Sequence, residues 1–86
     1  MQKEYFDSFN NLNVSEKRDV LIKDISDTLN VIETLCIKNN IKINKLKSAY
    51  YIKNQKLLFD EDYYNLMFIY ITYLKEDLAL LLKKSA

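Results

Sequence analysis

The sequence predicts an all-α protein, a small three- to four-helix bundle in which the second and last helices are long. Three observations support this fold class: apolar residues recur at helical spacing in three segments, Gly and Pro are absent, and 49% of the 86 residues are hydrophobic. Tight β-hairpins commonly rely on Gly at positive-φ positions. A chain without Gly turns more readily between helices, through Asn and Asp. We expect a single domain, residues 1–86.

The first predicted helix lies in the stretch QKEYFDSFNNL, which ends at an Asn pair. Its apolar residues follow the helical repeat at Tyr5, Phe6, Phe9 and Leu12. We therefore expect a short helix at the start of the bundle.

The second predicted helix is amphipathic and about six turns long. Ser15 can cap it with Glu16 in the first turn, and Asn13 with Glu16 three residues later is an alternative cap. Its apolar stripe consists of Leu21, Ile25, Leu29, Ile32 and Cys36. The pair Asn39-Asn40 is a favourable C-terminus, because Asn tolerates the left-handed conformation.

The third segment, IKINKLKSAYYIKNQKLLF, is expected to form a helix capped by Asn44. Ile41 and Ile43 alternate with polar residues as in a strand, but no other segment is a suitable partner strand. The lysines in the first turns oppose the helix dipole. A helix remains the better interpretation.

The last predicted helix spans residues 61–84. Asp60 can cap it, and the two acids that follow place negative charge in its first turn. Lys83 and Lys84 place positive charge at its other end. This segment has the clearest helix signals in the chain.

The uncharged run LMFIYITYL, residues 66–74, raises the possibility of a membrane span. Asp62 and Lys75 bracket only 12 uncharged residues, whereas a spanning helix needs about 20. We therefore expect no membrane span. A helix that is apolar on all faces is normally buried on all faces, and the other segments of so small a bundle cover only part of it.

Helix 61–84 offers two apolar stripes. The expected core stripe consists of Tyr63, Met67, Tyr70, Leu74, Leu78 and Leu81. The second stripe consists of Tyr64, Phe68, Ile71 and Leu82. We expect the second stripe to contact another chain, either a second copy or a physiological partner. The alternative is that the first and third helices cover it.

The residue types exclude several chemistries. The chain contains no His, no Gly, one Cys and one Arg. It therefore lacks the commonest general base, a structural zinc site of several Cys, a phosphate-binding Gly loop and a guanidinium cluster. We expect no catalytic residues, no metal and no cofactor. The single Cys36 lies in an apolar stretch and is expected to be a small buried hydrophobe.

Positive charge is concentrated in residues 38–56, which carry six Lys and no acid. Lys45, Lys47 and Lys53 are candidates for binding phosphate while Tyr50 or Tyr51 stacks on a base. The lack of further Arg weighs against direct base reading. A solvated face with inward-packed Tyr residues explains the pattern more simply, and a Lys-rich surface also suits an acidic protein partner.

These observations favour a non-catalytic protein-binding module of the inhibitor, immunity, antitoxin or adaptor type. The alternatives are a nucleic-acid-binding module that uses residues 38–56 and a structural homodimer within a larger assembly. The N-terminus shows no apolar signal sequence, and a lone Cys mildly favours a reducing compartment. The expected location is therefore the cytoplasm.

Overall fold

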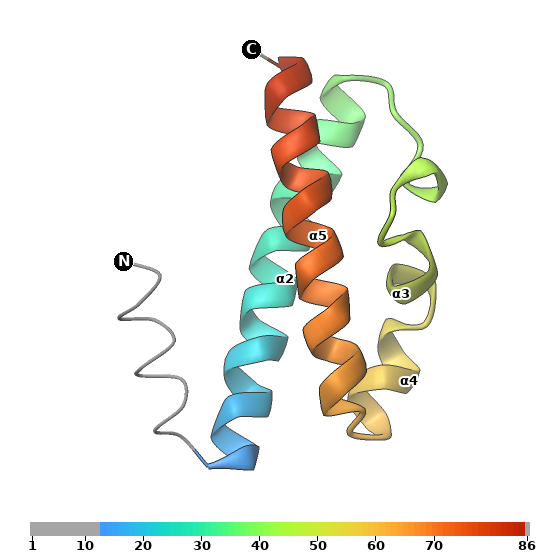
Figure 1. The fold of residues 1–86 in the computed structure, drawn as a ribbon. Helices are drawn as coiled ribbons and strands as arrows, with labels where there is room; N and C mark the ends of the chain where they lie inside the picture. Colours follow the sequence, from blue (N-terminus) through green and yellow to red (C-terminus); the bar gives the residue numbers. More distant parts are fainter. Residues whose placement is uncertain (1–12, 86) are drawn as a thin grey trace.

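In the computed structural model, which describes residues 13–85, the chain folds as two long helices joined by a crossover of shorter ones (Figure 1). Helices account for 84% of this range, and no strand occurs within it. The order is α2 (Val14–Lys38), the 3-10 turn η1 (Ile43–Lys45), α3 (Ala49–Lys53), α4 (Gln55–Asp60) and α5 (Tyr64–Ser85). The predicted all-α fold with long second and last helices is confirmed. The first predicted helix lies outside the described residues.

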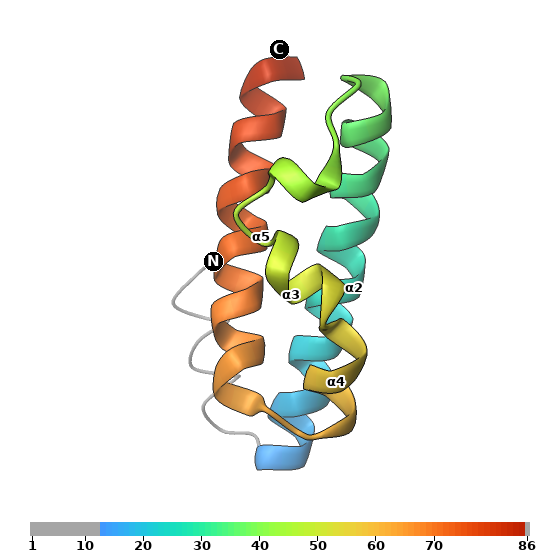
Figure 2. The ribbon, with the colours of Figure 1, turned by 90° about the vertical axis from the view of Figure 1, so that its right-hand side faces the viewer.

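The two long helices run parallel, side by side. Asp24 Oδ2 lies 3.2 Å from Lys75 Nζ, and further along Asn39 Nδ2 donates a hydrogen bond of 2.8 Å to Ser85 Oγ. Both helices therefore advance toward the same end of the molecule. A parallel pair requires a connection that returns along its whole length, and residues 39–63 provide this crossover. Figure 2 shows the crossover lying across one face of the pair.

Helix α2 begins at a capping box. The Asn13 side chain accepts a hydrogen bond of 2.8 Å from the Glu16 backbone N–H, and the Glu16 carboxylate accepts one of 3.4 Å from the Asn13 N–H. Of the two caps that the sequence allows, Asn13 is the one used, and Ser15 lies inside the first turn. The exchange satisfies two backbone donors that have no partner within the helix.

Helix α2 ends in a Schellman motif built on Asn. Asn40 has a φ of 56°, and the Ile41 N–H donates to the Cys36 carbonyl at 2.9 Å. The Asn40 N–H reaches the Ile37 carbonyl at 3.3 Å. Asn at the left-handed position replaces the Gly that usually occupies it, as the sequence predicts for a chain without Gly.

The core lies between α2, α5 and the crossover. All five residues of the predicted α2 stripe are buried, and α4 contributes Leu58. From the expected core stripe of the last helix, four residues are buried: Met67, Tyr70, Leu74 and Leu81. Leu78 is half-buried, and the prediction is wrong for Tyr63, which is 44% exposed because it precedes the first turn of α5.

The start of α5 differs from the prediction. Asp60 ends α4, Glu61 is the C-terminal cap of α4, and Asp62 adopts a φ of 61°. The Tyr63 N–H donates back to the Leu58 carbonyl at 3.1 Å. The acids therefore form the turn between two helices, because residues 55–60 are themselves helical and Asp tolerates the left-handed conformation that the reversal needs.

The third segment is not one helix. It is divided into η1, α3 and α4, and Asn44 lies inside η1 without capping a helix. Leu46 is extended, with a ψ of 154°, and interrupts the helical backbone. The physical reason is a long-range contact from α5, which binds the backbone of the next two residues.

Candidate functional site

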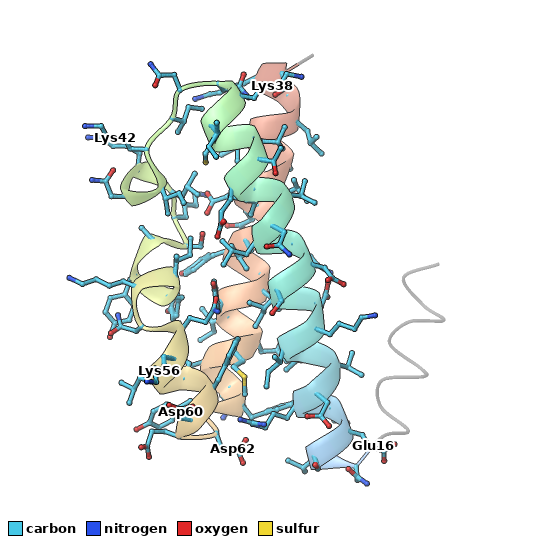
Figure 3. All side chains as sticks on the ribbon, turned by 180° about the vertical axis from the view of Figure 1, so that it is seen from behind. Glu16, Lys38, Lys42, Lys56, Asp60 and Asp62 are labelled. Carbon is cyan, nitrogen blue, oxygen red and sulfur yellow. The ribbon has the colours of Figure 1, made fainter. Side chains whose placement is uncertain are left out.

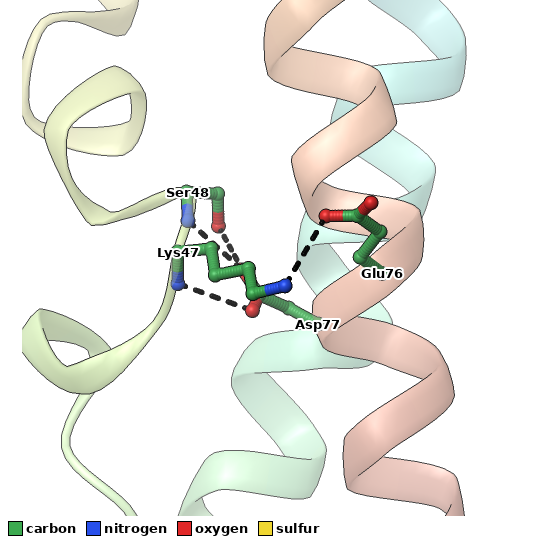
Figure 4. Close-up of polar contacts among 4 residues, drawn as sticks. All are labelled: Lys47, Ser48, Glu76 and Asp77. Atoms are coloured by element: carbon green, nitrogen blue, oxygen red, sulfur yellow. Dashed lines mark hydrogen bonds and ion pairs between the residues drawn. The ribbon is translucent and has the colours of Figure 1, made fainter.

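A buried carboxylate holds the crossover against α5 (Figure 4). Asp77, on α5, is 2% exposed. Its Oδ1 accepts a hydrogen bond of 3.1 Å from the Lys47 N–H, and its Oδ2 accepts bonds of 2.9 Å from the Ser48 N–H and 2.7 Å from the Ser48 hydroxyl. Ser48 is fully buried. Three donors compensate the burial of the charge and fix the position of the crossover.

Beside this contact lies a cavity of about 250 Å³, which we call the lysine groove. It is formed by residues 41–47 of the crossover and the last turns of α5. Its apolar lining consists of Ile41, Leu46, Leu80 and Leu81. Three exposed lysines border it, Lys45, Lys47 and Lys84, and Asp77 lies in its wall. The groove combines an apolar base with a cationic edge.

The positive charge at the groove is only partly neutralised. Lys47 Nζ lies 3.6 Å from a Glu76 carboxylate oxygen, and Asp77 is occupied by its three donors. Within residues 13–85, no acidic side chain pairs with Lys45 or Lys84. An anionic ligand at the groove therefore has two ammonium groups available to it.

The groove belongs to a larger basic end of the molecule. The two long helices end here, and six lysines cluster around those ends: Lys38, Lys42, Lys45, Lys47, Lys83 and Lys84. Figure 3 shows Lys38 and Lys42 at this end, and Glu16, Asp60 and Asp62 toward the opposite one, where Lys56 also lies. The small whole-chain charge of +1 therefore conceals a separation of charge along the molecule.

The structure separates the predicted Lys- and Tyr-rich site into two parts. Lys45 and Lys47 border the groove, whereas Tyr50, Tyr51 and Lys53 belong to α3 and do not line it. The Tyr51 ring stacks on Tyr70, with centroids 5.9 Å apart and planes at 18°. A ring held in this way is not presented for stacking on a base.

Two further rings, those of Tyr73 and Tyr50, pack against Tyr51. The Tyr73 ring lies 5.6 Å from it, and the Tyr50 ring meets it edge-on at 5.3 Å. Tyr50 is 68% exposed, so only Tyr51 follows the inward packing that the simpler interpretation predicts for both. Tyr70 donates its hydroxyl to Gln55 Oε1 at 2.7 Å, and burial raises the pKa of Tyr70, with a further contribution from the negative charge of Glu33.

The second stripe is only partly at the surface. Phe68 and Leu82 are 37% and 52% exposed, and Tyr64 is half-buried with its ring edge toward Phe68 at 6.0 Å. Ile71 is 5% exposed and belongs to the core, so the expectation that it lies on an exposed stripe is wrong. It shares a helical face with Met67 and Leu74 because these positions are three or four residues apart.

Sequence reasoning missed Asp77 and the groove that adjoins it. The available signal was an acid at a core position, since Asp77 lies three residues after Leu74 and four residues before Leu81, both of which belong to the predicted core stripe. An acid on a buried face requires donors from elsewhere in the fold. The position of those donors, about 30 residues earlier, has no local signature.

Cys36 is buried, and its burial raises the pKa of the thiol, as do the negative charges of Asp77 and Glu33. It is thus kept in the unreactive thiol form. Across residues 13–85, no group of three or more His, Cys, Asp or Glu side chains is placed to hold a metal ion.

Comparisons with models of protein families, with curated proteins and with solved structures find no match to this chain. Among residues 13–85, no helix has the length and apolar character needed to cross a membrane.

Proposed function

We propose that this chain is a small non-catalytic module that binds another protein, as inhibitors, immunity proteins, antitoxins and adaptors do. The observation that carries the proposal is the outer surface of α5. Its core face is complete, yet another side of the same helix presents large apolar side chains to solvent: Leu66, Ile69 and Leu80 are 36%, 40% and 50% exposed. Apolar side chains bordered by charged residues are typical of a protein-binding surface.

The chemistry of the surface favours protein over nucleic acid. Arg18 is the only Arg in the chain, and it is engaged with the Phe59 carbonyl and the Asp62 carboxylate. Tyr51, a candidate stacking residue, is packed on Tyr70. The only Arg and one of the two candidate stacking rings are thus engaged within the fold, and of those two rings Tyr50 alone is exposed.

Affinity capture of the tagged chain from its native cells, read by mass spectrometry, tests this function. We expect one protein to be enriched in amounts comparable to the bait and to be retained after nuclease treatment. Ile69→Glu should abolish the enrichment, because it places a charge on the outer face of α5. Leu57→Glu is the matched control on α4, where Leu57 is 51% exposed, and should retain it.

Two other results would contradict the proposal. Release of all captured protein by nuclease would favour nucleic-acid binding. Enrichment of nothing but a second copy of the chain, with a dimer seen by light scattering at micromolar concentration, would favour the structural homodimer.

A further inference from the structure

We propose that the lysine groove receives an acidic segment of the partner protein, which inserts one large apolar side chain between residues 41–47 and α5. In this arrangement the carboxylates that flank the inserted side chain lie against Lys45 and Lys84. The inference rests on the proposed function and adds to it the position of the site and the chemistry of the partner.

The size of the groove favours a side chain over a free small molecule. Sites for drug-sized ligands commonly enclose roughly 300–1,000 Å³, whereas this groove encloses about 250 Å³. Leu81 is 2% exposed at its base, and Leu80 is 50% exposed beside it. An inserted apolar side chain would bury the exposed surface of Leu80 above the base that Leu81 forms.

The groove is held open before any ligand arrives. Asp77 fixes the backbone of Lys47 and Ser48, so the crossover wall is not free to collapse onto α5. The Lys47 side chain is directed toward Glu76. A preformed site lowers the entropic cost of binding because fewer groups must be ordered on association.

The charge at the groove selects an acidic partner. Lysines at helix C-termini complement the helix dipole, which accounts for Lys38 and Lys84 without any ligand. Lys45 lies in the short turn η1, so it does not complement the dipole of a long helix. Together with Lys42 and Lys83, these residues present a positive field that attracts acidic segments and repels basic ones.

Fluorescence anisotropy with labelled synthetic peptides tests the inference. The probe is a Glu-rich helical peptide with one central Leu, and its two controls replace that Leu by Ser or every Glu by Lys. We expect the Glu/Leu peptide to bind with an affinity that falls as salt rises. The affinity of the Ser peptide should be lower by a factor of about ten or more, as expected for the loss of one apolar side chain from a pocket. The Lys peptide should not bind.

Matched variants of the protein locate the site. Lys45→Glu combined with Lys84→Glu, and separately Leu80→Ser, should each weaken binding of the Glu/Leu peptide about tenfold or more. Lys53→Glu combined with Lys56→Glu makes the same charge change on α3 and α4 and should weaken it far less. Circular dichroism of each variant verifies that the helices are retained.

The inference is overturned if the Glu/Leu peptide does not bind, or if Leu80→Ser leaves its affinity unchanged. It is also overturned if both pairs of charge reversals weaken binding equally, which would indicate a diffuse field without a site. None of these outcomes affects the capture of a partner through Ile69. A partner that is captured by the Lys45→Glu, Lys84→Glu variant as well as by the wild type would reject the groove and leave the proposed function intact.

Discussion

Asp77 is a single charged residue on the core face of α5, and the path of the crossover depends on it. Lys47 and Ser48 supply its three donors from a segment about 30 residues earlier in the chain. A buried carboxylate without donors would cost several kcal/mol. With them, it acts as a specific attachment point that apolar packing alone would not provide.

Asp77→Ala should therefore lower the free energy of unfolding by about 2–4 kcal/mol, because two backbone N–H groups and one hydroxyl lose their acceptor in a buried position. Urea denaturation at neutral pH measures the change. Glu76→Ala is the neighbouring control: it removes only the exposed pair with Lys47 and should cost less than about 1 kcal/mol. Equal effects of the two substitutions would contradict the role given to Asp77.

Because of Tyr70, the free energy of unfolding should fall as the pH becomes alkaline. Burial raises the pKa of its hydroxyl above the ordinary value of about 10. As the pH rises past 10, the unfolded chain releases this proton while the folded chain retains it, so the free energy of unfolding falls. Urea denaturation between pH 9 and 11 should show a smaller fall for Tyr70→Phe than for the wild type. Tyr50→Phe, at an exposed position, should retain the wild-type fall.

At the scale of elements, local pattern predicted α2 well. The stripe from Leu21 to Cys36 is buried as its spacing requires, and the turn at Asn40 follows from residue preference. The cap is Asn13, which the sequence offers only as the alternative to Ser15. These features depend on neighbours within four residues. The helical spacing that predicts them is therefore visible in the sequence.

The local sequence pattern did not predict the parts of the fold that depend on contacts between residues far apart in the chain. The crossover is divided at Leu46 because Asp77 binds the next two backbone N–H groups. The turn before α5 is held from α2, since Arg18 donates to the Phe59 carbonyl and pairs with Asp62. The lysine groove lies between residues 41–47 and the last turns of α5. Neither segment alone carries a sequence pattern that predicts the groove.

The capping box of α2 gives a prediction at this scale. Asn13→Ala should lower the free energy of unfolding by about 1 kcal/mol, because the Glu16 N–H loses its acceptor at the helix start. Ser15→Ala changes an exposed residue inside the first turn and should have almost no effect. Thermal denaturation of both variants measures the difference. A larger loss for Ser15→Ala would show that the helix starts at the other possible cap.

At the scale of the whole molecule, the parallel arrangement explains the separation of charge. Each helix carries a partial positive charge at its start and a partial negative charge at its end. Because α2 and α5 run parallel, like ends of their dipoles lie together. Glu16 and the acids 60–62 lie at the two positive ends, and lysines surround the two negative ends. The basic end thus stabilises the fold and also provides the field at the lysine groove.

Helices α2 and α5 end at the same end of the molecule, and the lysine groove and the basic end both require this arrangement. Crosslinking tests this directly in a Cys36→Ala background with two engineered thiols. Asn39→Cys with Ser85→Cys should be joined efficiently by a short bismaleimide, because the two native side chains are 2.8 Å apart. Asn39→Cys with Asn65→Cys should not react, since Asn65 lies 20 residues before Ser85 on α5, a distance of about 30 Å along the helix. Crosslinking of the second pair and not the first would show that the two helices are antiparallel.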